Sequence, residues 1–156
     1  MRTFVFGTLL TCWLSALPLP ARGFDLTGTW QGTQVCKLTT ADGKEKQVFK
    51  EDVLTITQSG TEVRIYMDSL DLLYTGVAFA NASHPEKGAV AFRLCGLSED
   101  TSTEGEMGNA QVSTKAPPKK SQFQATSIFA DDEEVDTCTW KYQRTATADP
   151  GVPACP

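Results

Sequence analysis

Apolar and polar residues alternate along most of this chain with a period of two, the spacing of a strand that buries one face. In residues 62–67, for example, Val63, Ile65 and Met67 interleave with more polar residues. Eight such runs are separated by turn-forming residues, and none has the 3.6-residue period of an amphipathic helix. They are Gly28–Leu38, Val48–Gln58, Glu62–Met67, Leu72–Ala80, Gly88–Cys95, Gly108–Lys115, Ser121–Phe129 and Val135–Thr145. The pattern predicts an all-β protein.

Residues 1–23 do not follow this alternation. Arg2 precedes the apolar stretch Phe4–Leu17, which is too short to span a bilayer. The segment Ala21–Gly23 then places small residues where a signal peptidase cuts. We therefore expect residues 1–23 to be a signal peptide that is removed before Phe24, and the mature protein to be secreted or periplasmic. No later apolar run is long enough to cross a membrane, so no membrane association is expected.

Eight consecutive strands with short links favour an up-and-down antiparallel β-barrel over residues 24–146, followed by a tail over residues 147–156. A two-sheet β-sandwich is the alternative, because strand counting alone does not separate the two folds. The register favours the barrel, since directly opposed residues in an antiparallel pair have position numbers with a constant sum. Trp30 and Arg144 sum to 174, and so do Cys36 and Cys138. Pairing of the first strand with the last is therefore predicted.

Four cysteines follow the predicted leader: Cys36, Cys95, Cys138 and Cys155. An even number in an exported domain indicates two disulfides, for which three connectivities are possible. A zinc site is not favoured, because no two cysteines have Cys-x-x-Cys spacing and the chain has one histidine, His84.

At Gly28-Thr29-Trp30 the chain resembles the calycin superfamily, which includes lipocalins, fatty-acid-binding proteins and avidins. Members open the first strand with Gly-x-Trp and carry an arginine near the end of the last strand that packs across the tryptophan at the closed end. The resemblance implies that Trp30 and Arg144 stack in this way, a cation–π contact of about 0.5–2 kcal/mol. The chain departs from lipocalins in lacking a late Thr-Asp-Tyr-type motif. It departs from avidins at Gln31–Thr33, so biotin binding is not implied.

The same resemblance suggests a disulfide pairing. Cys36 and Cys138 would join the first strand to the last on the inward side. Cys95 is expected to face outward, and a tail running up the outside of the barrel, as lipocalin tails often do, would bring Cys155 to it. Each closure typically adds about 2–4 kcal/mol, chiefly by restricting the unfolded chain.

The charge and the absence of known motifs argue against several classes of function. The chain has 19 acidic and 14 basic residues, a formal net charge of −5, which does not favour nucleic acid or anionic lipid as a partner. No nucleophile elbow, phosphate-binding glycine loop or paired-histidine metal motif is present. The acidic run Asp131–Asp136 lacks the spacing of a calcium loop and is better explained as a solvated rim. No catalytic role, metal or cofactor is predicted.

The interior remains as the candidate site. Alternation places six apolar residues inward and, we expect, toward the open end: Met67, Phe92, Leu94, Val112, Phe129 and Trp140. Such a lining suits a small apolar or amphipathic ligand, so noncatalytic ligand binding is the leading hypothesis. The alternative is a structural or protein-interaction domain with a filled barrel. Its contacts would come from loops expected at one rim, at residues 39–47, 69–71, 96–107 and 130–134.

Overall fold

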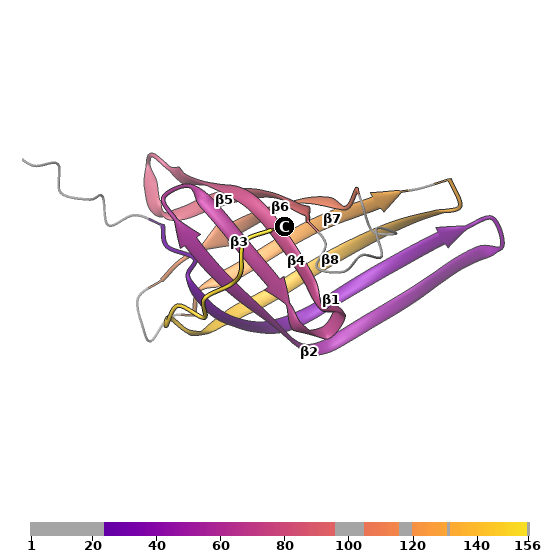
Figure 1. Cartoon of the computed structure of the whole chain (residues 1–156), viewed down its shortest axis with the longest axis horizontal. Coiled ribbons are helices and arrows are strands. Elements are labelled where there is room, and N and C mark those ends of the chain that lie inside the picture. The colour runs from indigo at the N-terminus through magenta and orange to yellow at the C-terminus, as the bar shows by residue number, and fades with distance from the viewer. Residues whose placement is uncertain (1–23, 96–104, 116–119, 131, 156) are drawn as a thin grey trace, which may run out of the picture.

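The computed structural model describes residues 24–95, 105–115, 120–130 and 132–155. It is a closed antiparallel barrel in which each strand pairs with the next in sequence and the last pairs with the first (Figure 1). The predicted all-β, eight-stranded, up-and-down barrel is therefore confirmed over the sandwich alternative. The predicted leader, residues 1–23, lies outside the described residues.

The strands run close to their predicted positions. Their bounds are β1 Gly28–Thr40, β2 Gly43–Ser59, β3 Glu62–Met67, β4 Leu72–Asn81, β5 His84–Leu94, β6 Met107–Ser113, β7 Gln122–Ala130 and β8 Glu134–Ala146. A single 3₁₀ turn, η1 (Asp68–Leu70), joins β3 to β4. No helix in the described part of the chain is long and apolar enough to span a membrane.

The seam between β1 and β8 has the predicted register. Trp30 lies opposite Arg144 and Cys36 lies opposite Cys138. The two cysteines form a disulfide with a Cα–Cα distance of 4.0 Å, which fastens the first strand to the last across 102 positions of sequence. Because β1 and β8 pair, the barrel leaves neither of them as a free edge.

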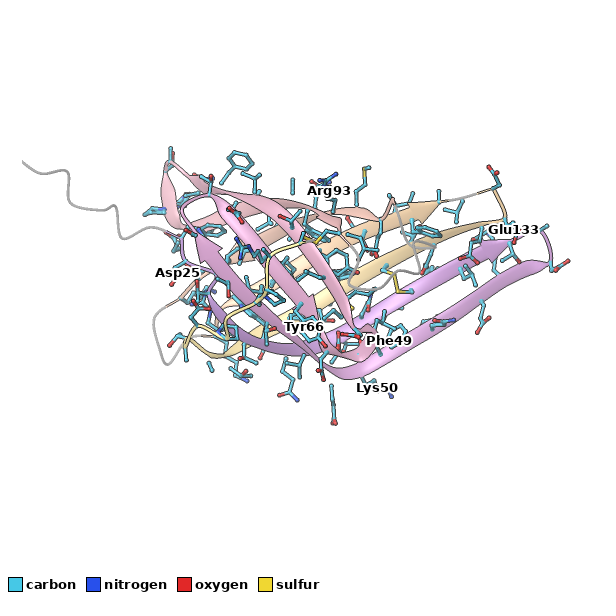
Figure 2. The ribbon with its side chains drawn as sticks, in the orientation of Figure 1. Asp25, Phe49, Lys50, Tyr66, Arg93 and Glu133 are labelled. Atoms are coloured by element: carbon cyan, nitrogen blue, oxygen red, sulfur yellow. A yellow bond between two sulfur atoms is a disulfide. The ribbon has the colours of Figure 1, made fainter. Side chains whose placement is uncertain are left out.

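A β-bulge in β2 decides which of its side chains face inward. The register between β1 and β2 shifts between Gly32 and Thr33, and Glu51 takes up the extra position with a φ of 58°. One added residue inverts the alternation, so Leu54 and Phe49 point to the same side of β2 although their numbers differ in parity. Figure 2 shows Phe49 and Lys50 leaving the strand in different directions.

The two ends of the barrel differ in strand length. The β1–β2 and β7–β8 hairpins extend well beyond β3, β4 and β5 at one end, which we call the open end (Figure 1). A loop was expected at residues 39–47, and this was wrong: β1 continues to Thr40 and β2 begins at Gly43. Pairing with β8 as far as Glu134 provides hydrogen-bond partners for this part of β1, which explains the added length.

The opposite end is closed by side chains. Trp30 is fully buried, and its indole Nε1 donates a 2.9 Å hydrogen bond to the carbonyl of Leu26. The guanidinium of Arg144 lies 4.7 Å from the centre of the Trp30 ring and donates to the carbonyl of Asp25. Phe123 meets the same indole edge-on at 6.0 Å. This layer is the floor of the barrel.

The tail after β8 runs along the outside of the barrel. The amide of Val152 donates to the hydroxyl of Thr57 at 3.0 Å, and Thr57 donates to the carboxylate of Asp149 at 2.7 Å. The tail crosses the outer side of β3 and β4 in Figure 1 and ends in the disulfide between Cys155 and Cys95. Both predicted disulfides are therefore present.

Candidate ligand site at the open end of the barrel

Five of the six residues predicted to line a ligand site are buried, and the sixth, Phe129, is half-buried. Phe92 and Trp140 lie together in the middle of the barrel, with ring centres 5.0 Å apart. Met67 lies between Leu54 and Leu72 of the neighbouring strands. The structure does not bring Val112 to the open end.

Val112 belongs to the closed end instead. It lies opposite Phe123, which packs against Trp30 in the floor. The expectation that it faces the mouth was wrong for a geometric reason. Strand β6 descends from the open end at Met107 to the closed end at Ser113, so Val112 is near the bottom of its strand.

An aromatic layer fills the middle of the barrel above the floor. The ring centre of Tyr74 lies 5.6 Å from Phe92 and 5.3 Å from Trp140, and Tyr142 lies 6.4 Å from Trp140. Most of these pairs meet edge to face, the arrangement that aromatic quadrupoles favour. Gly108 makes the layer possible, because a Cβ on it would lie 2.5 Å from the Phe92 ring. These rings separate the floor from the open end.

A carboxylate lies on the open-end side of this layer. The phenol of Tyr74 donates a 2.9 Å hydrogen bond to Glu106, and the hydroxyl of Ser127 also interacts with this carboxyl group. Ser127 in turn accepts a 3.2 Å hydrogen bond from the indole Nε1 of Trp140. Burial raises the pKa of Glu106, the two hydroxyl partners oppose that rise, and nearby Asp136 adds to it.

A second carboxylate, Asp52, is tied down by the chain. It accepts from the phenol of Tyr142 and from the backbone amides of Val53 at 2.8 Å and Ser69 at 3.2 Å. Gly32 lies between Asp52 and Tyr142 in the ladder, and a Cβ there would lie 2.1 Å from a backbone carbonyl of β8. Asp52 therefore has the partners of a structural group that anchors η1 to the barrel wall.

Two buried acceptors near the open end have no partner among the described residues. Gln34 faces inward opposite Trp140 and is 1% exposed, and its Oε1 accepts no hydrogen bond. The Oδ1 of Asp136 is buried and likewise unpaired. Burial also raises the pKa of Asp136, against a weaker opposing effect of its backbone hydrogen bond to Thr137. A buried acceptor left without a donor costs about 1–3 kcal/mol, so these two atoms lower the stability of the folded protein.

Apolar side chains ring this end without being fully covered. They lie on the inward side of four different strands and are each half-buried: Leu38 on β1, Phe49 on β2, Leu72 on β4 and Phe129 on β7. Most inward residues of the lower layers are below 5% exposed, so this ring marks where the packed core ends. Together with Glu106 and Asp136 it forms the mouth.

In the part of the chain that the structure describes, the one group near the mouth that could hold a metal ion is not a metal site of the usual kind. Cys36, Asp136 and Cys138 come close enough to share an ion. The two sulfurs are bonded to each other, however, and neither is a thiolate that could bind a metal.

The outer face of β4–β7 is a separate feature. Its outward positions expose four large apolar side chains: Val77, Phe79, Met107 and Ile128. A groove of about 420 Å³ lies between Val77 and Met107, over Gly76 and Ala91. Arg93, which projects from this face in Figure 2, borders the groove.

Sequence reasoning missed the polar members of the site. Gln34 and Tyr142 have the inward phase of the β1–β8 register, so two polar side chains at core positions were a readable signal. Glu106 fell in a segment interpreted as a rim loop. Asp52 lies beside the bulge, and no residue type in that stretch of sequence predicts a bulge.

No protein-family model matches this chain, and the comparison with curated proteins found no match. The barrel topology and the site geometry therefore carry the functional argument alone.

Proposed function

We propose that this protein is a noncatalytic carrier that binds a small, largely apolar molecule at the open end of its barrel. The observation that carries the proposal is the ring of half-buried apolar residues above a fully packed aromatic layer. If no ligand bound here, covering these side chains would make the folded protein more stable. Each 100 Å² of apolar surface removed from water adds roughly 2.5 kcal/mol to the stability of the fold.

The aromatic layer limits what can bind. Tyr74, Phe92 and Trp140 fill the centre and are buried, so a ligand would lie above this layer, against the half-buried side chains of the mouth, rather than fill the whole barrel. A compact molecule of about one or two rings suits such a shallow, aromatic-floored site better than a long chain.

Two further parts of the proposal concern context. The Trp30–Arg144 stack, together with the eight-stranded barrel, supports a calycin-like protein, in which ligand binding inside the barrel is common. The two disulfides support export to an oxidising compartment, secreted or periplasmic. Both statements stand as proposals beside the ligand site.

The test is native mass spectrometry of the disulfide-bonded protein, purified from an exporting host without detergent. A small molecule that co-purifies and is lost on denaturation is the expected result. The matched variants are Phe49→Ser, on the inward side of β2, and Val48→Ser, at the neighbouring outward position, which is 43% exposed. Phe49→Ser should lose the bound mass and Val48→Ser should keep it. Equal retention by both variants would contradict the proposed site.

A second candidate function rests on the outer face of β4–β7. Phe79 and Met107 are 58% and 60% exposed, and Met107, together with Val77, lines the shallow groove over Ala91. This surface has both protruding apolar side chains and a groove. In a dimer with two-fold symmetry, the side chains of each copy could therefore enter the groove of the other copy. Light scattering on the wild type and on Phe79→Asp tests this. A dimer that becomes a monomer in the variant is expected, and a monomeric wild type contradicts it.

A further inference from the structure

We propose that the outer face of strands β8, β1 and β2 binds a linear sulfated polysaccharide. Five exposed lysines lie on this face, which we call the lysine face: Lys37 on β1, Lys44, Lys46 and Lys50 on β2, and Lys141 on β8. The proposal does not depend on the ligand site at the mouth, because the lysine face is on the outer side of the barrel wall.

The register of the sheet places these lysines on the outer side. Cys36 is buried in the barrel, so its neighbour Lys37 points outward, since successive side chains of a strand alternate. Lys46 lies directly opposite Lys37 and shares its direction. Lys50 and Lys141 lie on either side of one outward residue of β1. Figure 2 shows Lys50 projecting away from the barrel.

The lysines have no carboxylate between them on this face. The outward positions of β1, of β8 and of residues 44–50 of β2 carry threonine, glutamine, valine and lysine. In the part of the chain that the structure describes, none of the five lysines makes an ion pair or a side-chain hydrogen bond. Asp42 and Glu51 lie at its two ends, in the hairpin turn and in the bulge. The face is therefore positive although the chain has a net charge of −5.

Protection of a sheet edge does not account for the whole face. Over residues 43–50, β2 pairs with β1 and with no other described strand, because its pairing with β3 begins at Leu54. Lysines on such an edge hinder pairing with other chains, which explains those of β2. Lys37 and Lys141 lie on strands that are paired on both sides. Directly opposed like charges, as in Lys37 and Lys46, destabilise a sheet, and an anionic partner would remove that cost.

The spread of the lysines favours a long ligand over a compact one. From Lys44 to Lys50 the strand advances by about 20 Å, and three neighbouring strands span about 10 Å. A single sulfate or phosphate ion reaches only part of this area, whereas a linear polyanion lying along β1 follows all of it. The hydroxyls of Thr33, Thr39 and Thr137 lie between the lysines and can donate to sulfate or sugar oxygens.

Two other polyanions fit this face less well. Its outward positions on the described strands carry no aromatic residue and no arginine, so nucleic-acid bases find neither a stacking platform nor a guanidinium that reads them. An anionic bilayer is planar, while the wall of a closed barrel curves away on both sides of β1. The exposed apolar residues here, Val48 and Val135, are shorter than the lysines around them and do not suit insertion into a bilayer.

The experiment measures binding of a heparin decasaccharide to the full disulfide-bonded protein by calorimetry. We expect binding at about 50 mM NaCl and a loss of affinity of at least about tenfold at about 200 mM NaCl, because salt competes with each lysine contact. The same decasaccharide stripped of its sulfate groups should bind at least about tenfold more weakly at the lower salt concentration.

Two double variants remove the same charge from different places. Lys37→Gln with Lys46→Gln removes the opposed pair at the centre of the lysine face, and should weaken binding of the decasaccharide at least about tenfold at about 50 mM NaCl. Lys87→Gln with Lys115→Gln removes two exposed lysines at the closed end, on β5 and after β6, and should weaken it less than about twofold. Circular dichroism confirms that both variants are folded.

Several results would overturn the proposal. Absence of binding at the lower salt concentration does so directly. An equal loss in the two double variants would mean that overall charge, and not the lysine face, attracts the decasaccharide. Equal binding of the desulfated decasaccharide removes the sulfate preference, and tighter binding to phosphatidylglycerol vesicles assigns the face to a membrane. None of these results bears on the mouth, which native mass spectrometry tests separately.

Discussion

The two ends of this barrel are built from the same eight strands, yet the hydrogen bonding of their buried polar groups differs. At the floor, Trp30 and Arg144 donate hydrogen bonds to carbonyls of residues just before β1, and the buried atoms there without a partner in the described part of the chain are the donor Nε of Arg144 and the hydroxyl oxygen of Ser113. At the mouth, the unpaired atoms are acceptors and the apolar ring is half-open. Among the residues that the structure describes, the floor is covered by the chain itself, while two acceptors at the mouth have no donor and the apolar ring there stays half-buried.

This difference teaches where stability and recognition reside. The floor residues stabilise the fold through burial and aromatic stacking, so substitutions there should lower the free energy of unfolding. Mouth residues retain exposed apolar area and unpaired acceptors at some cost in stability, which is the usual condition of a binding site. Four substitutions test this division, and each acts on one end only.

The largest effect is expected from Trp30→Ala at the floor. The variant loses a fully buried indole, its edge contact with Phe123 and its stack with Arg144. Large-to-small changes of a buried tryptophan cost about 3–5 kcal/mol. Urea denaturation measures the free energy of unfolding. A loss below about 1 kcal/mol would mean that the floor is not the stable end.

A smaller loss is expected from Arg144→Leu. The change removes the cation from the Trp30 ring and the hydrogen bond to the Asp25 carbonyl, worth together about 1–2 kcal/mol. Burial lowers the pKa of Arg144, so the guanidinium carries a desolvation cost that leucine would not, and this limits the loss. Arg144→Lys is the control, because it retains the charge but not the planar stack. A leucine variant as stable as wild type would contradict a stabilising stack.

At the mouth, Glu106→Gln should stabilise the protein above the ordinary carboxyl range of pH. Burial raises the folded-state pKa of Glu106, so its contribution to stability is fully present below the unfolded pKa of about 4.5 and is lost as pH rises through the folded value. Glutamine avoids that loss, and a rise in Tm of roughly 2–4 °C is expected at pH 7.5. At pH 4 the two proteins should melt alike. Thermal scans at both pH values check the sign, and a less stable variant at pH 7.5 would contradict it.

The smallest effect on folding is expected from Phe49→Ala. This side chain is half-buried in the ring around the mouth, so its removal should cost less than about 1.5 kcal/mol. The comparison with Trp30→Ala, measured in the same urea titration, directly ranks the two ends. If Phe49→Ala costs as much as Trp30→Ala, the mouth is part of the closed core and is not a site.

The fold was largely predictable because its main signals are the alternation within each strand and the constant sum of position numbers across an antiparallel pair. Period-two alternation gave all eight strands, and the shared sum of Trp30 with Arg144 and of Cys36 with Cys138 gave the closing register. These signals depend on spacing along single strands, which the sequence records directly. The up-and-down order then follows, since short links join neighbouring strands.

The site was much less predictable, for physical reasons. The bulge at Glu51 adopts a left-handed backbone at a residue other than glycine, so nothing in the sequence marks the inversion that brings Phe49 and Asp52 inside. Glu106 sits one residue before β6, in a segment whose polarity alone suggests a loop. Val112 was assigned to the wrong end because alternation tells which face a residue takes, but not how far along the barrel it lies.

The pairing of β1 with β8 also has a consequence for synthesis. Strand β1 pairs with β8, which is synthesised more than 90 residues later. The barrel therefore cannot close until nearly the whole chain is available. Folds dominated by such distant pairings form slowly. A ribosome-bound or truncated fragment that ends before Glu134 would present β1 and β7 as two open edges, ready to pair with other chains.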